Sequence, residues 1–211
     1  MEQHLLKKDI IDLERRFRTK LINSLSGFKS VNLVGTISQD GVTNLSIISS
    51  VVHIGADPAL MGFIMRPVTV RRDTYNNILE TGQYTFNHLN ASIFKKAHQT
   101  SARYPLEISE FEATELTEIY SDKIVAPYVE ESHIRIGLSF EEKIPISING
   151  TTLLIGRVEE LFFPKIALGE DGYLDIEKAG SITSSSLDAY HSTQKLARLS
   201  YAKADRAIRV I

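Results

Sequence analysis

The amino-acid sequence predicts a mainly β protein, an antiparallel barrel with a few peripheral helices. Strand-like segments outnumber helical ones, and tight-turn signals at Asp40-Gly41 and Asn149-Gly150 join neighbouring strands as hairpins. The chain also lacks the regular alternation of strands and helices that a doubly wound parallel sheet requires. Antiparallel strands joined by short turns favour closure into a barrel, so we expect that architecture.

The first half of the chain begins with an expected helix. In "KKDIIDLERRFRTKLINSLSGF" apolar residues recur at three- and four-residue steps, and Gly27 provides a stop. "SVNLVGTIS" then predicts a strand, "VTNLSIISSVV" a single return strand, and "PALMGFIM" a third strand that is nearly all apolar. A helix from about Asp73 to Thr81 leads into a further strand, "GQYTFNHL". These elements supply half of the expected barrel.

The second half begins with a short helical patch around "SIFKKAHQT", followed by a loop-rich stretch. There the acidic residues Glu110, Glu112 and Glu115 indicate a solvated loop. Most even positions of "HIRIGLSFEEKIPI" are apolar, which predicts a half-buried antiparallel strand, and "TTLLIGRVEELFF" returns beside it. We expect a barrel domain with its N-terminal helix over residues 1–180. A C-terminal tail over residues 181–211 would pack over the barrel or over a partner subunit.

Composition excludes several classes of function. The net charge of -2 argues against non-specific binding to nucleic acid or to a membrane surface. Without cysteine the chain has no disulfide, thiolate metal site or thiol nucleophile, and its six histidines show no short metal-ligand spacing. No apolar run approaches the roughly 18 residues of a membrane helix, and the charged N-terminus does not resemble a secretory signal. We therefore expect a cytoplasmic protein with no metal site.

The start of the helix near Asp73 carries an unusual set of side chains, namely Arg71, Arg72, Asp73 and Thr74. A helix N-terminus has unpaired N–H groups and the positive end of the helix dipole, so it attracts anions. Asp73 or Thr74 can cap the helix, and the guanidinium of Arg72 is a forked, permanently charged donor that matches a phosphate. Taken alone, this stretch also fits a surface helix start with solvated arginines.

A second set of polar groups lies on the strand "TNLSIISSVV". Its odd positions Leu45, Ile47 and Val51 are apolar, whereas its even positions Asn44, Ser46 and Ser50 are small and polar. Because a strand alternates faces, one face packs on the core and the other presents amide and hydroxyl groups. Such small groups leave room for a flat ligand close to the backbone, although an edge strand facing solvent is the alternative.

Together the two segments predict a site for a planar polar ring that carries a phosphate. The edge atoms of the ring would hydrogen-bond to the strand, and the phosphate would sit at the helix start. Flavin mononucleotide (FMN) fits this description. A dinucleotide is disfavoured because no G-x-G-x-x-G turn follows the first strand.

The order of these motifs resembles the flavin reductase-like, FMN-binding split-barrel family, which includes flavoredoxin and NADH:FMN oxidoreductase-like proteins. The resemblance covers roughly residues 20 to 203 and rests on four segments: Asn44 to Ser49, Asp57 to Leu60, Arg72 to Ile78, and Thr81 to Asn87. The chain departs from the family at Phe28-Lys29-Ser30, where Pro-Arg-Pro is frequent, at Ala59, which replaces a second proline, and at His98, where methionine is frequent. These departures touch the rim of the expected pocket and leave the choice of substrate open.

The resemblance implies a homodimer of split barrels with FMN near the subunit interface. Ser46, Ile48, Ser49 and Ser50 would approach the flavin ring and ribityl chain, Arg72 and Thr74 would hold the phosphate, and Asn44 matches the strand asparagine of the family. No protein acid or base is expected to be catalytic. The full set expected to bind the cofactor is Asn44, Ser46, Ile47, Ile48, Ser49, Ser50, Arg66, Arg71, Arg72, Thr74, Asn87 and His191.

The favoured function is that of an oxidoreductase which passes electrons from NADH or NADPH through FMN to an unidentified small-molecule acceptor. A non-catalytic FMN-binding module or electron carrier is the alternative, in which the tail segment "LDAYHSTQK" would cover the flavin. A third interpretation is a protein that has lost flavin and only dimerises. The sequence has no recognisable nicotinamide motif that would choose between NADH and NADPH.

Overall fold

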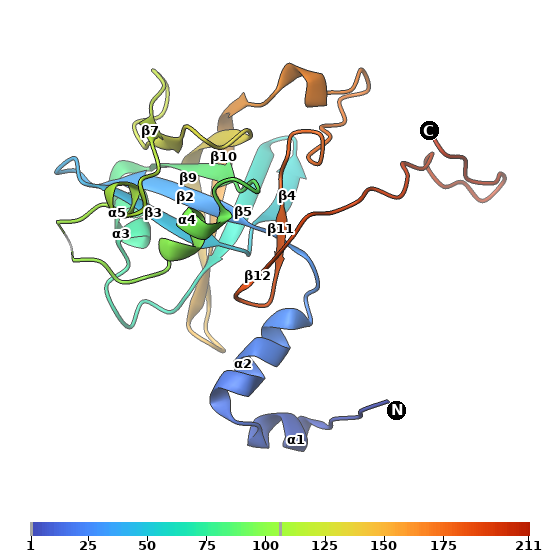
Figure 1. Ribbon diagram of the computed structural model, residues 1–211, viewed down its shortest axis with the longest axis horizontal. Helices are drawn as coiled ribbons and strands as arrows, with labels where there is room; N and C mark the ends of the chain where they lie inside the picture. The colour runs from blue at the N-terminus through green and yellow to red at the C-terminus, as the bar shows by residue number, and fades with distance from the viewer. Residues whose placement is uncertain (1, 106) are drawn as a thin grey trace.

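The computed structural model describes residues 2–105 and 107–211 and confirms a mainly β protein (Figure 1). Its body is a seven-stranded antiparallel sheet in the order β3-β2-β6-β9-β10-β5-β4. The strands of this sheet are β2 (Asn32–Ile37), β3 (Thr43–Ile48), β4 (Val52–Ala56), β5 (Ala59–Met65), β6 (Gln83–His88), β9 (Arg135–Ile146) and β10 (Thr151–Phe162).

The two edge strands, β3 and β4, follow one another in the chain, so the sheet curls until its edges approach. The hydroxyl of Ser50, in the short link between them, accepts a 3.1 Å hydrogen bond from the N–H of Ile64 in β5. The link between β3 and β4 therefore joins the two edges of the sheet, as in a split barrel, and this contact holds the link against β5. The expected single return strand over "VTNLSIISSVV" is therefore wrong, because the chain turns between Ile48 and Val52.

Two hydrophobic clusters lie on the two faces of the sheet. The barrel interior is filled by Val34, Phe63, Tyr84, Phe86, Leu138 and Leu154. On the other face, Leu33 and Leu45 pack under the helices α4 (Phe94–Gln99) and α5 (Glu110–Thr114). The small β7 (Glu118–Ile119) and β8 (Tyr128–Val129) sheet completes this outer layer. β2 and β3 thus lie between two hydrophobic clusters, which determines which side chains of β3 point to each side of the sheet.

Both predicted hairpin turns are confirmed. Gly41 and Gly150 adopt φ values of 82° and 72°, which residues with a side chain rarely adopt. The predicted burial alternation in β9 holds only for its first half, where Ile136 and Leu138 are buried. The outer half of the β9–β10 hairpin extends beyond the core, and 92% of Ile148 near its tip is exposed.

The expected single N-terminal helix is instead two, α1 (Lys7–Asp12) and α2 (Arg15–Ser24). Leu13 between them is extended at ψ 144°, and the carboxylate of Glu14 accepts the N–H of Phe17 at 2.9 Å. Glu14 therefore caps a new helix rather than continuing the first one. Neither helix buries a residue, and both project away from the barrel (Figure 1).

The C-terminal part follows a short 3₁₀ helix, η1 (Lys165–Ala167). β11 (Thr183–Ser185) lies between β1 (Lys29–Ser30) and β12 (Ala189–His191) in a separate three-stranded sheet. After β12 the chain leaves the body as an extended arm that folds back on itself, closed by bridges between Leu199 and Val210 and between Lys203 and Arg206 (Figure 1). Within the described residues, no helix has the length and apolar character needed to cross a membrane.

Candidate functional site

The helix α3 (Asp73–Thr81) begins beside the polar face of β3. Its boundaries agree with the sequence-based expectation, and it ends at Gly82 in the left-handed conformation, φ 71°. Arg72 occupies the N-cap position with extended backbone, but its side chain does not cap the helix. The first-turn N–H groups of α3 are therefore donors that no capping side chain satisfies.

The structure brings the two predicted segments together through a chain of hydroxyl and amide groups. The Nδ2 of Asn44 donates to the Oγ1 of Thr74 at 2.9 Å, and the hydroxyls of Ser46 and Thr74 are 2.8 Å apart. Asn44 and Ser46 share one face of β3, as the alternation predicted, because each pairs with a residue on the same face of β2. The start of α3 is thereby tied to the middle of β3.

Asn44 has a positioning role in this cluster. It is only 8% exposed, and its amide also approaches the hydroxyl of Thr36 at 3.3 Å. Thr36 is held in turn by the amide of Asn77 from the helix, at 3.2 Å. Both contacts of the Asn44 amide are made within the protein, so Asn44 holds the cluster together, while Ser46 is less buried.

The three predicted arginines have different environments. Arg71 pairs with Asp73, Nε to Oδ1 2.5 Å, on the surface, and Arg66 is exposed after β5. Arg72 is partly buried, and its Nε is shielded from solvent without a hydrogen-bond partner among the described residues. A permanent cation with an unused buried donor, next to an uncapped helix start, fits a phosphate group. Only Arg72 of the three combines these features.

The end of β3 supplies the remaining predicted residues. Ile47 packs against the outer cluster and Ile48 against the barrel interior, so each anchors the strand on one side. Ser49 is half-buried beyond them, and Ser50 is fixed to the backbone of Ile64. This arrangement gives a rigid strand end next to the cluster.

Two predicted residues lie elsewhere. Asn87 pairs with Leu33 in the sheet register and so faces the outer layer, opposite to Asn44 and Ser46. Its amide donates to Leu33 O and Thr85 Oγ1, and its oxygen accepts the N–H of Val129 at 2.9 Å. Asn87 therefore joins β6 to β8 instead of lining the cluster.

His191 is likewise engaged within the C-terminal sheet. Its Nε2 lies 2.8 Å from the hydroxyl of Ser185, and its ring centroid is 4.9 Å from that of Phe28. No hydrogen bond between described residues joins it to the cluster of Asn44, Ser46 and Thr74. The contacts of His191 therefore lie within the C-terminal sheet and with Phe28.

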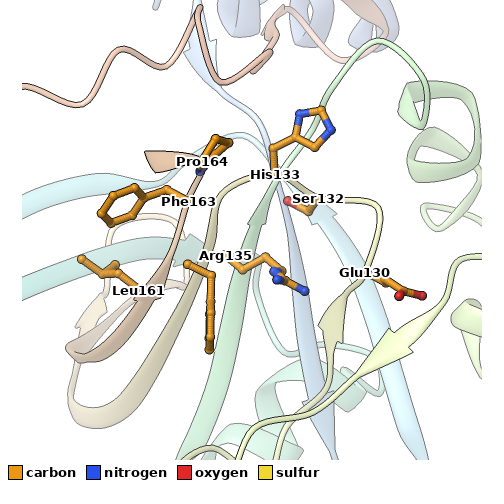
Figure 2. A pocket seen from close by; sticks show the side chains of 8 residues that line it. Glu130, Ser132, His133, Arg135, Leu161, Phe163 and Pro164 are labelled. Atoms are coloured by element: carbon orange, nitrogen blue, oxygen red, sulfur yellow. The ribbon is translucent and has the colours of Figure 1, made fainter. Parts of the chain in front are cut away.

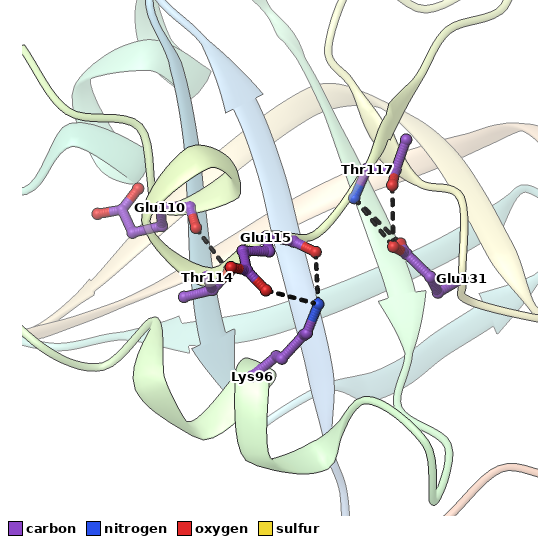
Figure 3. A network of polar contacts seen from close by, with 6 residues as sticks. All are labelled: Lys96, Glu110, Thr114, Glu115, Thr117 and Glu131. Atoms are coloured by element: carbon purple, nitrogen blue, oxygen red, sulfur yellow. Dashed lines mark hydrogen bonds and ion pairs between the residues drawn. The ribbon is translucent and has the colours of Figure 1, made fainter.

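The solvated loop that the sequence indicates at Glu110 is a wrong prediction, because this residue lies in a helix. It opens α5, and its carboxylate accepts the backbone N–H of Leu45 at 2.9 Å. Burial raises the pKa of this carboxyl group, against the opposing effect of that hydrogen bond. Figure 3 shows Glu110 beside Thr114 on α5, with Lys96 of α4 joined to Glu115. Ser109 is a preferred N-cap residue type, and its hydroxyl accepts the N–H of Phe111, so this serine is a sequence signal for the helix.

A separate hollow of about 510 Å³ lies near the start of β9 (Figure 2). Arg135 lies over the ring of Phe162, 5.1 Å from its centroid, and His133 and Ser132 lie at the rim. Arg135 pairs with Asn87 in the register and so belongs to the sheet face opposite the cluster. None of the sequence-predicted site residues lines this hollow.

The curled sheet defines a split-barrel protein in which the polar cluster on β3 lies beside the uncapped start of α3. The sequence model of the flavin reductase like domain matches residues 27–178, so the chain belongs to that family. This confirms the resemblance deduced from the motifs.

Solved structures agree with this assignment. A split-barrel domain protein from Shewanella frigidimarina is 48% identical, with a TM-score of 0.92 over 95% of this chain and 100% of that chain. Component B of nitrilotriacetate monooxygenase from Bacillus cereus is 25% identical, with a TM-score of 0.82 over 94% and 100%. Flavoredoxin of Desulfovibrio vulgaris shares the fold at 22% identity, with a TM-score of 0.69 over 84% and 91%.

Proposed function

We propose that this chain binds FMN where β3 meets the start of α3 and acts as an oxidoreductase that passes electrons from NADH or NADPH to a small acceptor. The observation that carries the proposal is the buried, unpartnered Nε of Arg72 beside the uncapped helix start. Shielding a cation's donor nitrogen from water without a partner is costly, and a phosphate would supply that partner. Membership of the flavin reductase-like family supports the same cofactor.

Each residue of the site would have a distinct task. Arg72 and the first-turn N–H groups of α3 would hold the phosphate, and Asn44 would keep Thr74 in place beneath it. Ser46 and the backbone around Ser49 would meet the polar edge of the ring. Bound FMN would supply the hydride and electron transfer, so the protein's contribution is binding and orientation.

We also propose that the working unit is a homodimer, on the strength of the family resemblance. The apolar surface of the single chain supports this, since Phe17, Phe28 and Tyr201 are each more than half exposed. Large aromatic side chains are more often buried than exposed in folded proteins. A partner copy would cover such groups.

The test is a redox titration of the purified protein. We expect FMN to bind and quench its fluorescence, and its absorbance to bleach when NADH or NADPH is added without oxygen. Bleaching of the bound flavin supports the enzyme. Failure of the protein to bind FMN at all would overturn the proposal.

A carrier module is the second candidate, and a bound flavin that does not respond to either nicotinamide would favour it. In that case the segment around His191 was expected to cover the flavin. Residues 189–191 instead form β12, which pairs with β11, and His191 contacts Ser185 and Phe28. This arrangement favours the enzyme over a carrier whose flavin is covered by its own tail.

A further inference from the structure

The single chain exposes far more surface than its mass requires. A compact monomer of 23.6 kDa is expected to expose about 9,800 Å², from the general relation between accessible surface and mass. This chain exposes 13505 Å². The excess is roughly 3,700 Å² per chain, and obligate homodimers bury about 1,000 to 2,500 Å² or more on each partner.

Most of the irregular outline comes from two terminal segments, which we call the N-terminal arm (residues 2–26) and the C-terminal arm (residues 192–211). Both project from the body (Figure 1), and both lie outside residues 27–178, which match the family. Each arm exposes apolar side chains, namely Leu6, Ile11, Phe17, Ile22 and Leu25 in the first, and Leu196, Leu199, Tyr201, Ile208, Val210 and Ile211 in the second.

Neither arm has enough contacts of its own to hold its shape. The helices α1 and α2 are 6 and 10 residues long and bury no residue, and isolated helices of this length are marginal in water. The C-terminal arm ends in a two-stranded loop held by backbone contacts such as Ser200 N to Arg209 O, 2.8 Å. An isolated two-stranded hairpin is also marginal in water. An ordered arm of either kind therefore needs a surface to pack on.

Charge indicates which surface that is. The C-terminal arm carries five Lys or Arg and one carboxylate, and the N-terminal arm carries six cations and four carboxylates. Residues 27–191 carry thirteen cations and twenty-one carboxylates. Both arms are thus basic and the body is acidic, so a second copy of the same chain offers a complementary surface.

The first part of the C-terminal arm already uses this complementarity within the chain. Arg198 pairs with Asp171 and Lys195 with Asp175, and the Arg198 guanidinium lies 4.1 Å from the centroid of Tyr173. These contacts fix where the arm leaves the body. Residues 201–211, beyond these contacts, are all exposed. This part of the arm is therefore not covered by its own chain.

We propose that the two arms form the interface of an arm-exchanged homodimer, in which the arms of each copy lie on the acidic body of the other. This inference rests on the homodimer of the proposed function and assigns its contacts to segments outside the family domain. It places the apolar side chains of the arms, Tyr201 and Ile208 in particular, in the intersubunit contact.

The test is the dimer dissociation constant of the full-length chain, measured by sedimentation equilibrium. We expect the double substitution Tyr201→Asp/Ile208→Asp to raise that constant at least tenfold, and Phe17→Asp/Leu25→Asp to do the same. The matched pair Tyr201→Phe/Ile208→Leu keeps the apolar surface, so it should dimerise like the unmodified chain. A dimer whose dissociation constant is unchanged in both acidic variants would overturn the arm proposal.

Trypsin provides an independent measurement, because cleavage after Lys203 and Arg206 reports whether the C-terminal arm is covered. We expect cleavage there to slow as protein concentration rises through the dissociation constant; cleavage at a concentration-independent rate would count against arm exchange. A chain that stays monomeric would contradict both the homodimer proposal and the arm-exchange proposal. A dimer whose dissociation constant does not depend on the arms would contradict only the arm-exchange proposal. FMN titration of the same samples reports the flavin proposal separately.

Discussion

The amide of Asn44, on β3, donates a 2.9 Å hydrogen bond to the hydroxyl of Thr74, in the first turn of α3. The two residues are separated by two strands and a loop in the chain, yet this contact sets where the helix start lies against the sheet. Because both side chains are less than a tenth exposed, water cannot replace a lost partner easily. The pair thus links the stability of the fold to the geometry of the site.

Asn44→Ala should therefore weaken both the stability of the fold and the binding of FMN. Thr74 and Thr36 would each lose a buried partner, and we expect the free energy of unfolding to fall by about 1 to 3 kcal/mol. FMN affinity should fall as well, because the helix start would no longer be held. Urea denaturation measures the first effect. Gln39→Ala removes an exposed amide with one long 3.5 Å contact and serves as the control, expected to change stability by less than about 0.5 kcal/mol.

Gly35 of β2 has a different role, because the backbone of Pro127 passes directly over it. A Cβ added at Gly35 would clash with the carbonyl oxygen of Pro127 and lie 2.6 Å from Thr85 Oγ1. Gly35→Ala should lower the free energy of unfolding by about 1 to 3 kcal/mol, since backbone cannot move aside as a flexible side chain does.

Gly55 in β4 is the matched control for this change. The nearest atom to an added Cβ there is Pro58 O at 3.4 Å, an ordinary contact. Gly55→Ala should leave thermal stability within about 0.5 kcal/mol of the unmodified chain. Similar losses at both glycines would contradict the steric explanation.

Local signals in the sequence predicted much of this fold. The turns at Gly41 and Gly150 need a left-handed backbone, and the helix from Asp73 ends at a third such glycine, Gly82, so these boundaries were readable from residue type alone. The alternation of Asn44 and Ser46 with Leu45 also fixed their faces correctly. Such features depend on a few neighbouring residues.

Features that depend on distant partners were missed. The break after Ile48 arises because Ser50 bonds to Ile64 in another strand, and the orientation of Asn87 follows from the register of β6 against β2. The sequence around Glu110 indicates a solvated loop, because the partner of its carboxylate, the N–H of Leu45, lies 65 residues away. A single sequence contains no direct record of these pairings.

His88 predicts a dependence of stability on pH. Burial lowers its pKa to about 4, and its Nδ1 lies 3.0 Å from the hydroxyl of Ser181. The native ring therefore resists protonation that the unfolded chain accepts at its ordinary pKa near 6.5. Stability from this group is intact above about pH 6.5 and is lost as pH falls toward 4, by at most about 3 kcal/mol.

The measurement is the urea midpoint of unfolding between pH 7 and pH 4. His88→Gln should flatten the decline across this window even if it lowers stability at pH 7, because the variant has no imidazole to protonate. His53→Gln changes an exposed histidine of β4 and should leave the slope as it is. An identical slope in the unmodified chain and in His88→Gln would show that His88 does not titrate in this range.

Arg72 gives the sharpest test of the site, because its neighbour Arg71 is a natural comparison. Arg72→Gln removes a cation whose Nε is buried without a partner, whereas Arg71→Gln removes one that already pairs with Asp73 on the surface. A charge-assisted phosphate contact contributes about 1.5 to 3 kcal/mol, so Arg72→Gln should weaken FMN binding more than about tenfold. Arg71→Gln should weaken it only slightly, because exposed charges interact weakly in water.

Riboflavin, which lacks the phosphate, separates a phosphate contact from a general disturbance of the pocket. Its affinity should be the same in the unmodified chain and in Arg72→Gln when both are measured by fluorescence quenching. Flavin-free Arg72→Gln should also be no less stable to urea than the unmodified chain, since the unmodified chain shields the Nε of Arg72 from water without a partner. Equal losses of riboflavin and FMN affinity would mean that Arg72 supports the pocket without touching a phosphate, and the anion site at the start of α3 would then have to be abandoned.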